Sequence, residues 1–427
     1  MSGGSDHGGD LVGSVLELEV GEVAHGGHCI ARHDGQVVFV RHAVPGERVR
    51  AQVTEQRRGY LRADAVEILR VSPDRVTPPC PYAGPGRCGG CDFQHVDPAA
   101  IRRLKATVVA ESLIRLGGLS AEEVAALNLV VEELPGGAVQ WRERVQYAVD
   151  PAGRVGFRRY RSHEVIPIDR CRIAVPEIQQ ADVTSRRWPG VSTVEVIAVP
   201  GEPVTVLTRQ RRHSSRGMKV VRGARRVRRS VLGREWTMAP DAFWQAHRAA
   251  AERYATALLE LLKPRIGERV WDLYGGAGLF TATLADAIGP TGAVTLVEVD
   301  PRTEAERNLA DLPQARVVRG RVERVLAAGE LGPVDLVVLD PPRAGAGADV
   351  VAAISAAAPR AVAYLACDPA ALARDVKEFR QRGWRLATLR AFDAFPMTHH
   401  VECLALFEPR DSAERHHGAD RASIRDD

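Results

Sequence analysis

Three short motifs able to do chemistry each follow an apolar run in the carboxyl-terminal part of the chain. They are Asp272-Leu-Tyr-Gly-Gly-Ala-Gly278, Asp340-Pro-Pro-Arg343 and Cys367-Asp-Pro369. Glycines let a backbone turn tightly and approach a ligand closely, whereas prolines fix its conformation. A cysteine thiolate is a strong nucleophile, although a lone buried cysteine is more often inert packing. The motifs indicate a cofactor site with a candidate nucleophile, Cys367, beside it.

Two carboxylates extend this candidate site. Glu298 ends the apolar run after the glycine motif, where a carboxylate can accept hydrogen bonds from both hydroxyls of a ribose. The glycines lack the spacing G-x-G-x-x-G of dinucleotide sites, so the pattern favours an adenosyl nucleoside as the cofactor. Glu402, at the start of the last apolar run, is a candidate base.

The region from about 236 to 408 must position these residues. In it apolar strand-like runs alternate with helical runs, which predicts a doubly wound sheet with helices on both faces. Helices are expected over 243–262, 350–358 and 370–382. Ligands of such sheets bind beyond the carboxyl ends of the strands, which is where the three motifs fall.

The earlier part of the chain is expected to be rich in strands. Residues 11–71 alternate between apolar and polar residues with turn signals between the runs, which predicts a small β-barrel. Such barrels often bind oligonucleotides. The candidate contacts are Arg41, Arg48, Arg57, Arg58 and Tyr60. Residues 72–235 are expected to form a β-rich central domain, and the polar segments 1–10 and 409–427 disordered tails.

Seven cysteines, an odd number, argue against a framework of disulfides in this chain. Cys80, Cys88 and Cys91 follow one another at short spacing, and Cys171 is the next cysteine along the chain. Thiols clustered in this way usually bind metal. Four thiolates suit either a zinc ion or a 4Fe–4S cluster, and the spacing does not choose between them.

The net charge of +4 says little about partners, but the distribution of charge says more. Eleven basic residues lie between Thr205 and Arg234, where no acidic residue occurs. This basic run could neutralise phosphates of a nucleic acid, or it could be a solvated loop. No long uncharged apolar run or signal-like amino terminus is present, so we expect a cytoplasmic protein without membrane contact.

Taken in order, the motifs resemble those of the bacterial RNA 5-methyluridine methyltransferases, and the resemblance runs from about residue 11 to 408. It also includes Cys88-Gly-Gly-Cys91, Phe93-Gln-His95, Trp141-Arg-Glu-Arg144, Gly156-Phe-Arg-Arg159, Phe243-Trp-Gln245 and His399-His-Val-Glu402. The resemblance implies a multidomain fold: an OB-like TRAM barrel that binds RNA, a β-rich central domain with an iron–sulfur site, and a Rossmann-like class I methyltransferase domain over 236–408.

The resemblance also implies roles for individual residues. Cys367 would be the nucleophile that adds to C6 of a uracil, and Glu402 would accept the C5 proton. The residues that would hold S-adenosylmethionine are Gln245, Tyr274, Glu298 and Asp340. The residues that would ligate a 4Fe–4S cluster are Cys80, Cys88, Cys91 and Cys171. The partner would be RNA, ribosomal or transfer, with no obligate protein partner.

Some positions depart from the family pattern. Gly275 stands where many members have Cys, Leu279 where some have Asn, and Asp368 replaces an Asn that some members have beside the nucleophile. Arg321 lies near where an acidic or amide residue often faces the adenine. These departures leave the reaction intact, but they loosen the set of cofactor contacts.

Three other functions are alternatives to the methylation of uracil in RNA. Radical RNA methylthiotransferases also combine iron–sulfur, S-adenosylmethionine and a TRAM barrel, but they use a C-x3-C-x2-C triad and place the barrel last. RNA 5-methylcytosine transferases commonly use a second active-site cysteine, and Cys403 should face the opposite side of its strand from Glu402. The third alternative is a non-enzymatic RNA-binding or chaperone protein.

Overall fold

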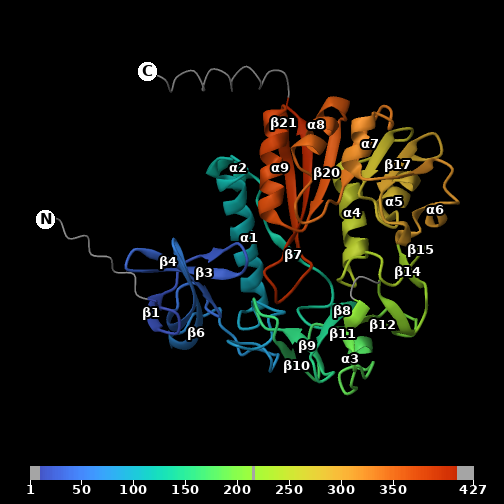
Figure 1. The fold of residues 1–427 in the computed structure, drawn as a ribbon. Helices are drawn as coiled ribbons and strands as arrows, with labels where there is room; N and C mark the ends of the chain where they lie inside the picture. Colours follow the sequence, from blue (N-terminus) through green and yellow to red (C-terminus); the bar gives the residue numbers. More distant parts are fainter. Residues whose placement is uncertain (1–9, 214–216, 411–427) are drawn as a thin grey trace, which may run out of the picture.

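The computed structural model describes residues 10–213 and 217–410 (Figure 1). The expected tails, 1–10 and 409–427, lie outside the described residues except for Asp10, Pro409 and Arg410. Arg216 of the basic run also lies outside them. In chain order, the described residues form an N-terminal β-domain, a central β-sheet and a C-terminal α/β-domain.

Alternation of apolar and polar residues builds the N-terminal domain. In β1 (Val15–Glu19), Leu16 and Leu18 are buried while their neighbours in the strand are exposed. The strands of the sheet lie in the order β1-β5-β6-β4-β3-β2 and enclose an apolar core of their own. The other strands are β2 (Val23–Ala24), β3 (His28–His33), β4 (Gln36–Arg41), β5 (Arg48–Arg57) and β6 (Tyr60–Arg70).

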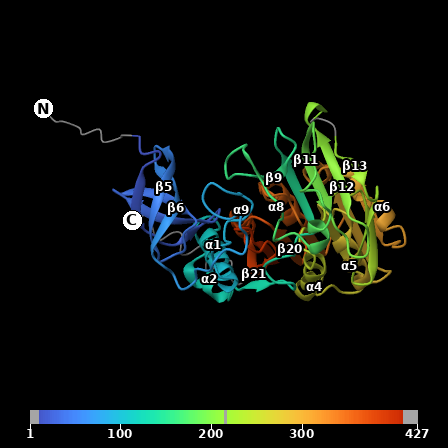
Figure 2. The same ribbon diagram turned by 90° about the horizontal axis from the view of Figure 1, so that it is seen from below.

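The central sheet has the strand order β10-β9-β8-β11-β12-β13, and a separate hairpin, β14–β15, follows it. Its apolar core is distinct from that of the N-terminal domain. Its elements are β8 (Arg144–Val149), β9 (Val155–Arg158), β10 (Val165–Pro167), α3 (Pro176–Gln179), β11 (Val191–Ile197), β12 (Thr205–Gln210), η1 (Arg211–His213), β13 (Lys219–Arg222), β14 (Val227–Val231) and β15 (Arg234–Met238). Figure 2 shows the central sheet and the N-terminal domain on opposite sides of the molecule.

The C-terminal sheet has the strand order β18-β17-β16-β19-β20-β22-β21-β7. Neighbouring strands are parallel except that β22 is antiparallel to both β20 and β21. The doubly wound sheet expected for this region is therefore present, with one reversed strand inserted. The strands are β7 (Val131–Glu133), β16 (Arg269–Leu273), β17 (Ala293–Glu298), β18 (Ala315–Arg319), β19 (Leu336–Leu339), β20 (Ala361–Ala366), β21 (Trp384–Asp393) and β22 (Glu402–Pro409).

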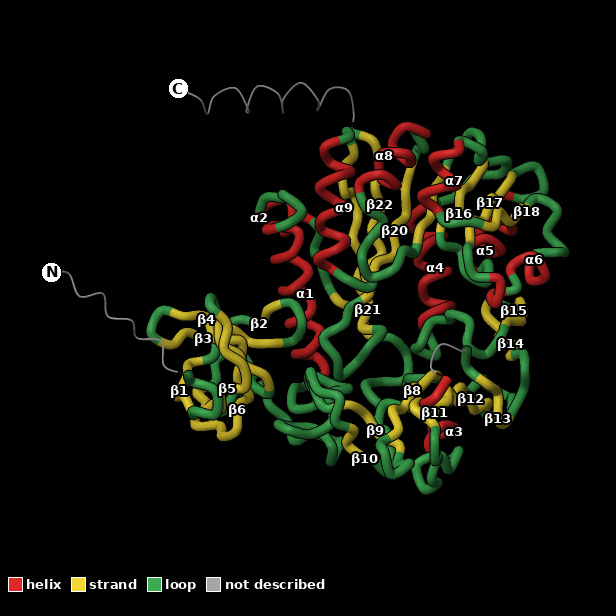
Figure 3. Tube along the Cα trace, in the orientation of Figure 1, coloured by secondary structure: helices red, strands yellow, loops and turns green. Residues whose placement is uncertain are grey.

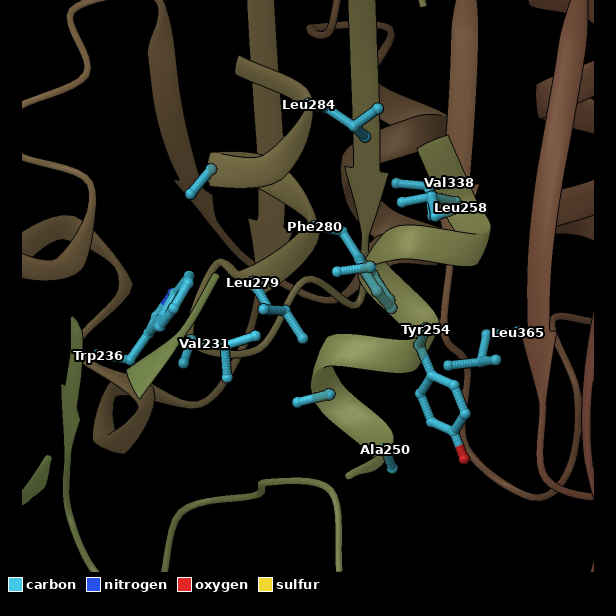
Figure 4. Close-up of a cluster of buried hydrophobic side chains, with 14 of the residues drawn as sticks. Val231, Trp236, Ala250, Tyr254, Leu258, Leu279, Phe280, Leu284, Val338 and Leu365 are labelled. Atoms are coloured by element: carbon cyan, nitrogen blue, oxygen red, sulfur yellow. The ribbon is translucent and has the colours of Figure 1, made fainter. Parts of the chain in front are cut away.

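Helices cover both faces of this sheet (Figure 3). One face packs against α4 (Ala250–Leu262), α5 (Leu279–Ile288) and α6 (Ala305–Asn308), the last of which follows η2 (Pro301–Thr303). The other face packs against α1 (Pro98–Arg115), α2 (Ala121–Ala126), α7 (Val322–Ala328), α8 (Ala348–Ala357) and α9 (Pro369–Gln381). Figure 4 shows the first of these packed faces, where Tyr254 and Leu258 of α4 meet Val338 and Leu365 of the sheet.

The division of the chain differs from the expected one at residues 98–133. The sequence pattern places them in the central domain, but α1 packs beside α9 and β7 pairs in parallel with β21. Val109 and Leu113 of α1 are buried in the core between the C-terminal sheet and helices α7, α8 and α9. A short strand and a helix without a marked apolar face carry no local signal of which sheet they join, so only the tertiary packing decides this.

None of the helices in the described ranges combines the length and the apolar character that a membrane span requires.

A buried ion pair fastens α1 to the C-terminal sheet. The Nζ atom of Lys105 donates a hydrogen bond to Oδ1 of Asp393 at 2.6 Å and another to the carbonyl oxygen of Phe395 at 3.1 Å. The two side chains are only 1% and 4% exposed. Because Asp393 ends β21, the pair fixes the point where the chain leaves that strand.

Lys105→Met should lower the free energy of unfolding by about 3 kcal/mol, because it leaves the Asp393 carboxylate buried without its cation. Urea denaturation followed by intrinsic fluorescence measures this loss. The double variant Lys105→Met, Asp393→Leu removes both charges and should recover most of the stability. A single variant as stable as the wild type would show that the pair does not fasten α1.

Candidate active site

One face of the C-terminal sheet carries most of the candidate catalytic and cofactor residues. Val270, Val338 and Leu365 belong to the apolar core under α4. Because side chains alternate along a strand, Asp272, Asp340 and Cys367, two residues further on, point to the same face. All three lie at or just beyond the carboxyl ends of parallel strands, so they converge on the same edge.

The reversed strand β22 brings Glu402 to this edge. Its pairing with β20 places Ala366 opposite Cys403, and one further step of the same register places Cys367 opposite Glu402. Directly opposite residues on paired strands share a face, so the two side chains lie next to each other. Cys403 is fully buried in the core of the opposite face, as its alternation with Glu402 predicts.

These residues surround a cavity of about 520 Å³, a size that suits a small-molecule ligand. The cavity holds every catalytic and cofactor residue predicted from the sequence: Gln245, Tyr274, Glu298, Asp340, Cys367 and Glu402. The structure therefore brings together in one place residues that are far apart along the chain. Their individual roles stay predictions.

Backbone geometry shapes the cofactor end of the cavity. The Glu298 carboxylate accepts hydrogen bonds from the backbone N–H of Gly276 at 2.9 Å and of Asp300 at 2.6 Å, which ties the glycine motif to the end of β17. Tyr274 adopts a φ of 62°, a left-handed conformation that non-glycine residues rarely take. Gln245 Nε2 donates a hydrogen bond to Oδ2 of Asp340 at 3.3 Å and links the segment before α4 to this wall.

Burial dominates the electrostatics of the site. It raises the pKa of Asp340 to about 7, with the nearby Asp272 carboxylate adding to the rise. Burial, then Asp340, raises the pKa of Glu402 well above its usual range. Burial, Glu402 and Asp340 raise the pKa of the Cys367 thiol to about 12, while Arg343 lowers it. Strongly shifted acids that share a cavity are typical of functional sites.

Two further cavity residues were not singled out from the sequence. Arg343, the last residue of the Asp340-Pro-Pro-Arg343 motif, is the cation that lowers the pKa of both Cys367 and Glu402. His400 contacts it, with Nε2 lying 3.3 Å from Nη2 of Arg343. The position of Arg343 directly after two prolines, which hold the backbone at the cavity edge, was the available signal.

The N-terminal domain touches this site through the turn between β2 and β3. Nε2 of His25 lies 3.4 Å from Oδ2 of Asp368, the neighbour of Cys367. At Gly27 the φ is 77° and an added Cβ would lie 2.9 Å from Cβ of His399, so no larger residue fits. Arg41, expected to contact RNA, is instead buried, with its guanidinium stacked 3.6 Å from the centre of the Tyr160 ring.

The four candidate metal ligands line a second cavity, of about 340 Å³: Cys80, Cys88, Cys91 and Cys171. Within the described ranges, no group of three or more His, Cys, Asp or Glu side chains is placed to hold a metal ion. Burial raises the pKa of Cys88 to about 11, and Cys171 and Cys80 add to the rise. The thiols share one cavity without forming a compact single-ion site.

The basic run is less free than its composition suggests. Four of its arginines form ion pairs with acidic side chains from other segments: Arg226 with Glu304, Arg228 with Glu202, Arg229 with Glu143 and Arg234 with Asp311. These pairs hold the β14–β15 hairpin against its surroundings. Part of the run is therefore structural, and a count of charges along the sequence overstates the cations that could meet phosphates.

Comparisons with known proteins agree with this architecture. The model of the TRAM domain matches residues 10–66, and the model described as tRNA (Uracil-5-)-methyltransferase matches residues 331–410. An uncharacterized RNA methyltransferase of Streptomyces avermitilis is 49% identical, over 93% of this chain and 99% of that protein. The 23S rRNA (uracil(1939)-C(5))-methyltransferase RlmD of Alkalilimnicola ehrlichii is 32% identical, over 92% of this chain and 96% of that protein.

A solved structure has a similar fold over most of the chain. The Pyrococcus abyssi tRNA (uracil-54, C5)-methyltransferase, in complex with S-adenosyl-L-homocysteine, superposes with a TM-score of 0.67 and 20% identity. The match covers 91% of this chain and 99% of that one. With full-length relatives and the family model in agreement, the chain belongs to the family of S-adenosylmethionine-dependent RNA uracil-5-methyltransferases.

Proposed function

We propose that this protein methylates C5 of a uracil in 23S ribosomal RNA through a covalent bond between Cys367 and C6. One observation carries the proposal: Cys367 and Glu402 stand opposite each other, one register step beyond the last pairing of β20 with β22, on the wall of a large cavity. A nucleophile and a base are thus held side by side by the backbone itself.

The residues divide the reaction between them. Bound S-adenosylmethionine would supply an electrophilic methyl group, whose bond to the sulfonium sulfur breaks on transfer and leaves S-adenosylhomocysteine. The Cys367 thiolate forms a bond to C6, and the electron pair of the C5–C6 double bond moves into an enolate, which makes C5 nucleophilic enough to take the methyl group. Glu402 then accepts the proton of C5, the double bond re-forms, and the bond from C6 to sulfur breaks to release the thiolate.

A neighbouring cation offsets part of the effect of burial on both groups. Arg343 is the cation that favours the thiolate of Cys367 and the carboxylate of Glu402, because it lowers the pKa of each. The half-buried Cys367 faces the cavity, where an extruded base can reach it. Asp368 caps the N-terminus of α9 and accepts a hydrogen bond from the backbone N–H of Ala371 at 2.8 Å, which fixes the turn after Cys367.

The RNA substrate is the finer part of the proposal. The full-length relative RlmD, named for a uracil of 23S ribosomal RNA, supports that substrate. A transfer RNA is the alternative, supported by the family model of residues 331–410. A purely RNA-binding or chaperone role needs no nucleophile beside a base, so the pairing of Cys367 with Glu402 favours an enzyme.

Deletion of the gene should remove 5-methyluridine from one position of 23S ribosomal RNA and leave transfer RNA unchanged. Mass spectrometry of nucleosides from the two purified RNA pools, followed by mapping of the fragment, measures this. Complementation with the wild-type protein, but not with Cys367→Ala, should restore the modification. Loss from transfer RNA alone would assign the alternative substrate, and no loss from either pool would contradict the proposed activity.

Glu402→Gln should trap a covalent complex between protein and RNA, because the amide cannot accept the proton whose removal allows the thiolate to leave. A denaturing gel should show a shifted band that needs both RNA and S-adenosylmethionine and survives heating. The double variant Cys367→Ala, Glu402→Gln is the control and should give no shifted band. Turnover by Glu402→Gln should fall by about 100-fold or more. An absent band, or turnover equal to that of the wild type, would remove Glu402 from this step.

We also propose that Cys80, Cys88, Cys91 and Cys171 ligate a 4Fe–4S cluster. The four thiols line one cavity, and a zinc ion would need all of them about 2.3 Å from one centre. Within the described ranges no three of the thiols are placed to hold one ion, which favours a cluster over zinc. When bound, the cluster would cross-link the loop around Cys88 to the segment around Cys171, a structural part rather than a redox one, because methyl transfer consumes no electron.

Protein purified without oxygen should contain about four iron atoms and four sulfides per chain and absorb in the visible range. Cys171→Ser should lose most of the iron and lower the midpoint of thermal unfolding, because the cross-link is broken. The control is Cys29→Ser, which alters a buried cysteine of the N-terminal core that lies outside the cavity. One zinc and no iron in protein prepared in this way would contradict the cluster.

A further inference from the structure

The buried carboxylate of Glu402 lacks a hydrogen-bond donor in the part of the chain that the structure describes. Its side chain is 3% exposed, and none of the residues that the structure describes donates a hydrogen bond to its carboxylate. To accept a proton it must first be ionised, and burial and the neighbouring Asp340 both oppose ionisation. Arg343 is one favourable charge, but a carboxylate buried this deeply is usually stabilised by direct donors as well.

The hydroxyl of Tyr254, a hydrogen-bond donor, lacks an acceptor within the described ranges. It is 1% exposed, and its hydroxyl is fully buried without a hydrogen-bond partner among the described residues. A buried hydroxyl without an acceptor costs about 1–3 kcal/mol, so a phenylalanine would be the cheaper core residue at this position. Figure 4 shows the ring beside Leu365, with its hydroxyl at the edge of the apolar cluster.

Strand pairing places Tyr254 beside Glu402. The Tyr254 ring packs on the Phe392 ring, with the centroids 5.4 Å apart. Phe392 is the residue of β21 directly opposite Glu402 of β22, so the two side chains share a face of the sheet. That face is the one covered by α4, from which Tyr254 projects. A donor without an acceptor and an acceptor without a donor are therefore neighbours in one buried region.

We propose that Tyr254 is a positioning residue for Glu402, and that in the RNA-bound enzyme its hydroxyl donates a hydrogen bond to the Glu402 carboxylate. The bond orients the carboxylate toward C5 and favours its ionised form. Among the charged groups that act on the Tyr254 hydroxyl, Glu402 is the strongest and Asp340 the next. Asp340 already accepts a hydrogen bond from Gln245, which leaves Glu402 as the open acceptor.

The other charged groups around Glu402 are accounted for by element. Arg253 and Arg390, which lie over Phe392, are held by Glu132 and do not compete for Glu402. The groups that face the cavity beside Glu402 are Asp340 and Arg343 after β19, Cys367 after β20 and His400 before β22. Tyr254 is thus the neutral donor that α4 adds to this set.

The test is the pH dependence of turnover in Tyr254→Phe, which deletes only the hydroxyl. If the bond forms, its loss raises the pKa of Glu402, so the acidic limb of kcat should move to higher pH by about one unit. Turnover at pH values below the limb should then fall about tenfold, with the KM for RNA unchanged. Tyr254→Met should give the same shift, because it too lacks the hydroxyl.

The control is Thr208→Val. Thr208 of β12 also carries a buried hydroxyl without a partner among the described residues, but it lies in the central sheet. Both Tyr254→Phe and Thr208→Val should keep or raise thermal stability, and only Tyr254→Phe should move the pH profile. A wild-type profile in Tyr254→Phe would overturn the inference and make Tyr254 a packing residue.

The inference rests on the proposed role of Glu402, and the two can fail separately. A covalent complex trapped by Glu402→Gln, together with an unchanged pH profile of Tyr254→Phe, refutes the role of Tyr254 and leaves that of Glu402 intact. No trapped complex refutes the role of Glu402, and the inference falls with it. A trapped complex and a shifted profile support both.

Discussion

The candidate active site depends on the antiparallel pairing of β22 with β20. Parallel strands bring their carboxyl ends to one edge, which gathers Asp272, Asp340 and Cys367. A strand parallel to these can contribute to this edge only residues at its carboxyl end. Because β22 runs the other way, it begins at the edge, and its first residue, Glu402, lies opposite the proposed nucleophile one register step beyond the last pairing. The proposed base is therefore positioned by backbone hydrogen bonds rather than by a loop.

Because of the same reversal, the segment between β21 and β22 contacts residues from distant parts of the chain. Lys105 of α1 holds Asp393 and the carbonyl of Phe395 where this segment begins. Nδ1 of His399 lies 2.7 Å from Oδ2 of Asp92, which comes directly after the last cysteine of the Cys88–Cys91 loop. Parts from each region thus fix the approach to Glu402, so damage to the four-cysteine cavity could reach the active site by this short route.

Much of this site could be predicted from the sequence, because its residues end apolar runs that read as strands. That Cys367 and Glu402 are neighbours could not be read from the local pattern, since pairing register between distant strands leaves no mark in either. The role proposed for Tyr254 could not be predicted for a different reason. An aromatic residue at the helical spacing of core positions indicates only packing. The arginine run suggested more free cations than the structure has, because the acidic residues that pair with it lie elsewhere in the chain.

Charge gives the site a preference for its ligand. Asp272 is 1% exposed and Glu402 3%, while Asp340 lines the cavity, and burial raises the pKa of each. Burying several carboxyl groups together is costly unless a cation compensates for them, and Arg343 is a single charge. A positively charged ligand in the cavity would favour the ionised carboxylates, whereas a neutral one would not. The sulfonium of S-adenosylmethionine carries such a charge and its demethylated product does not. In the proposed reaction the buried carboxyl groups would therefore favour the charged methyl donor over its uncharged product.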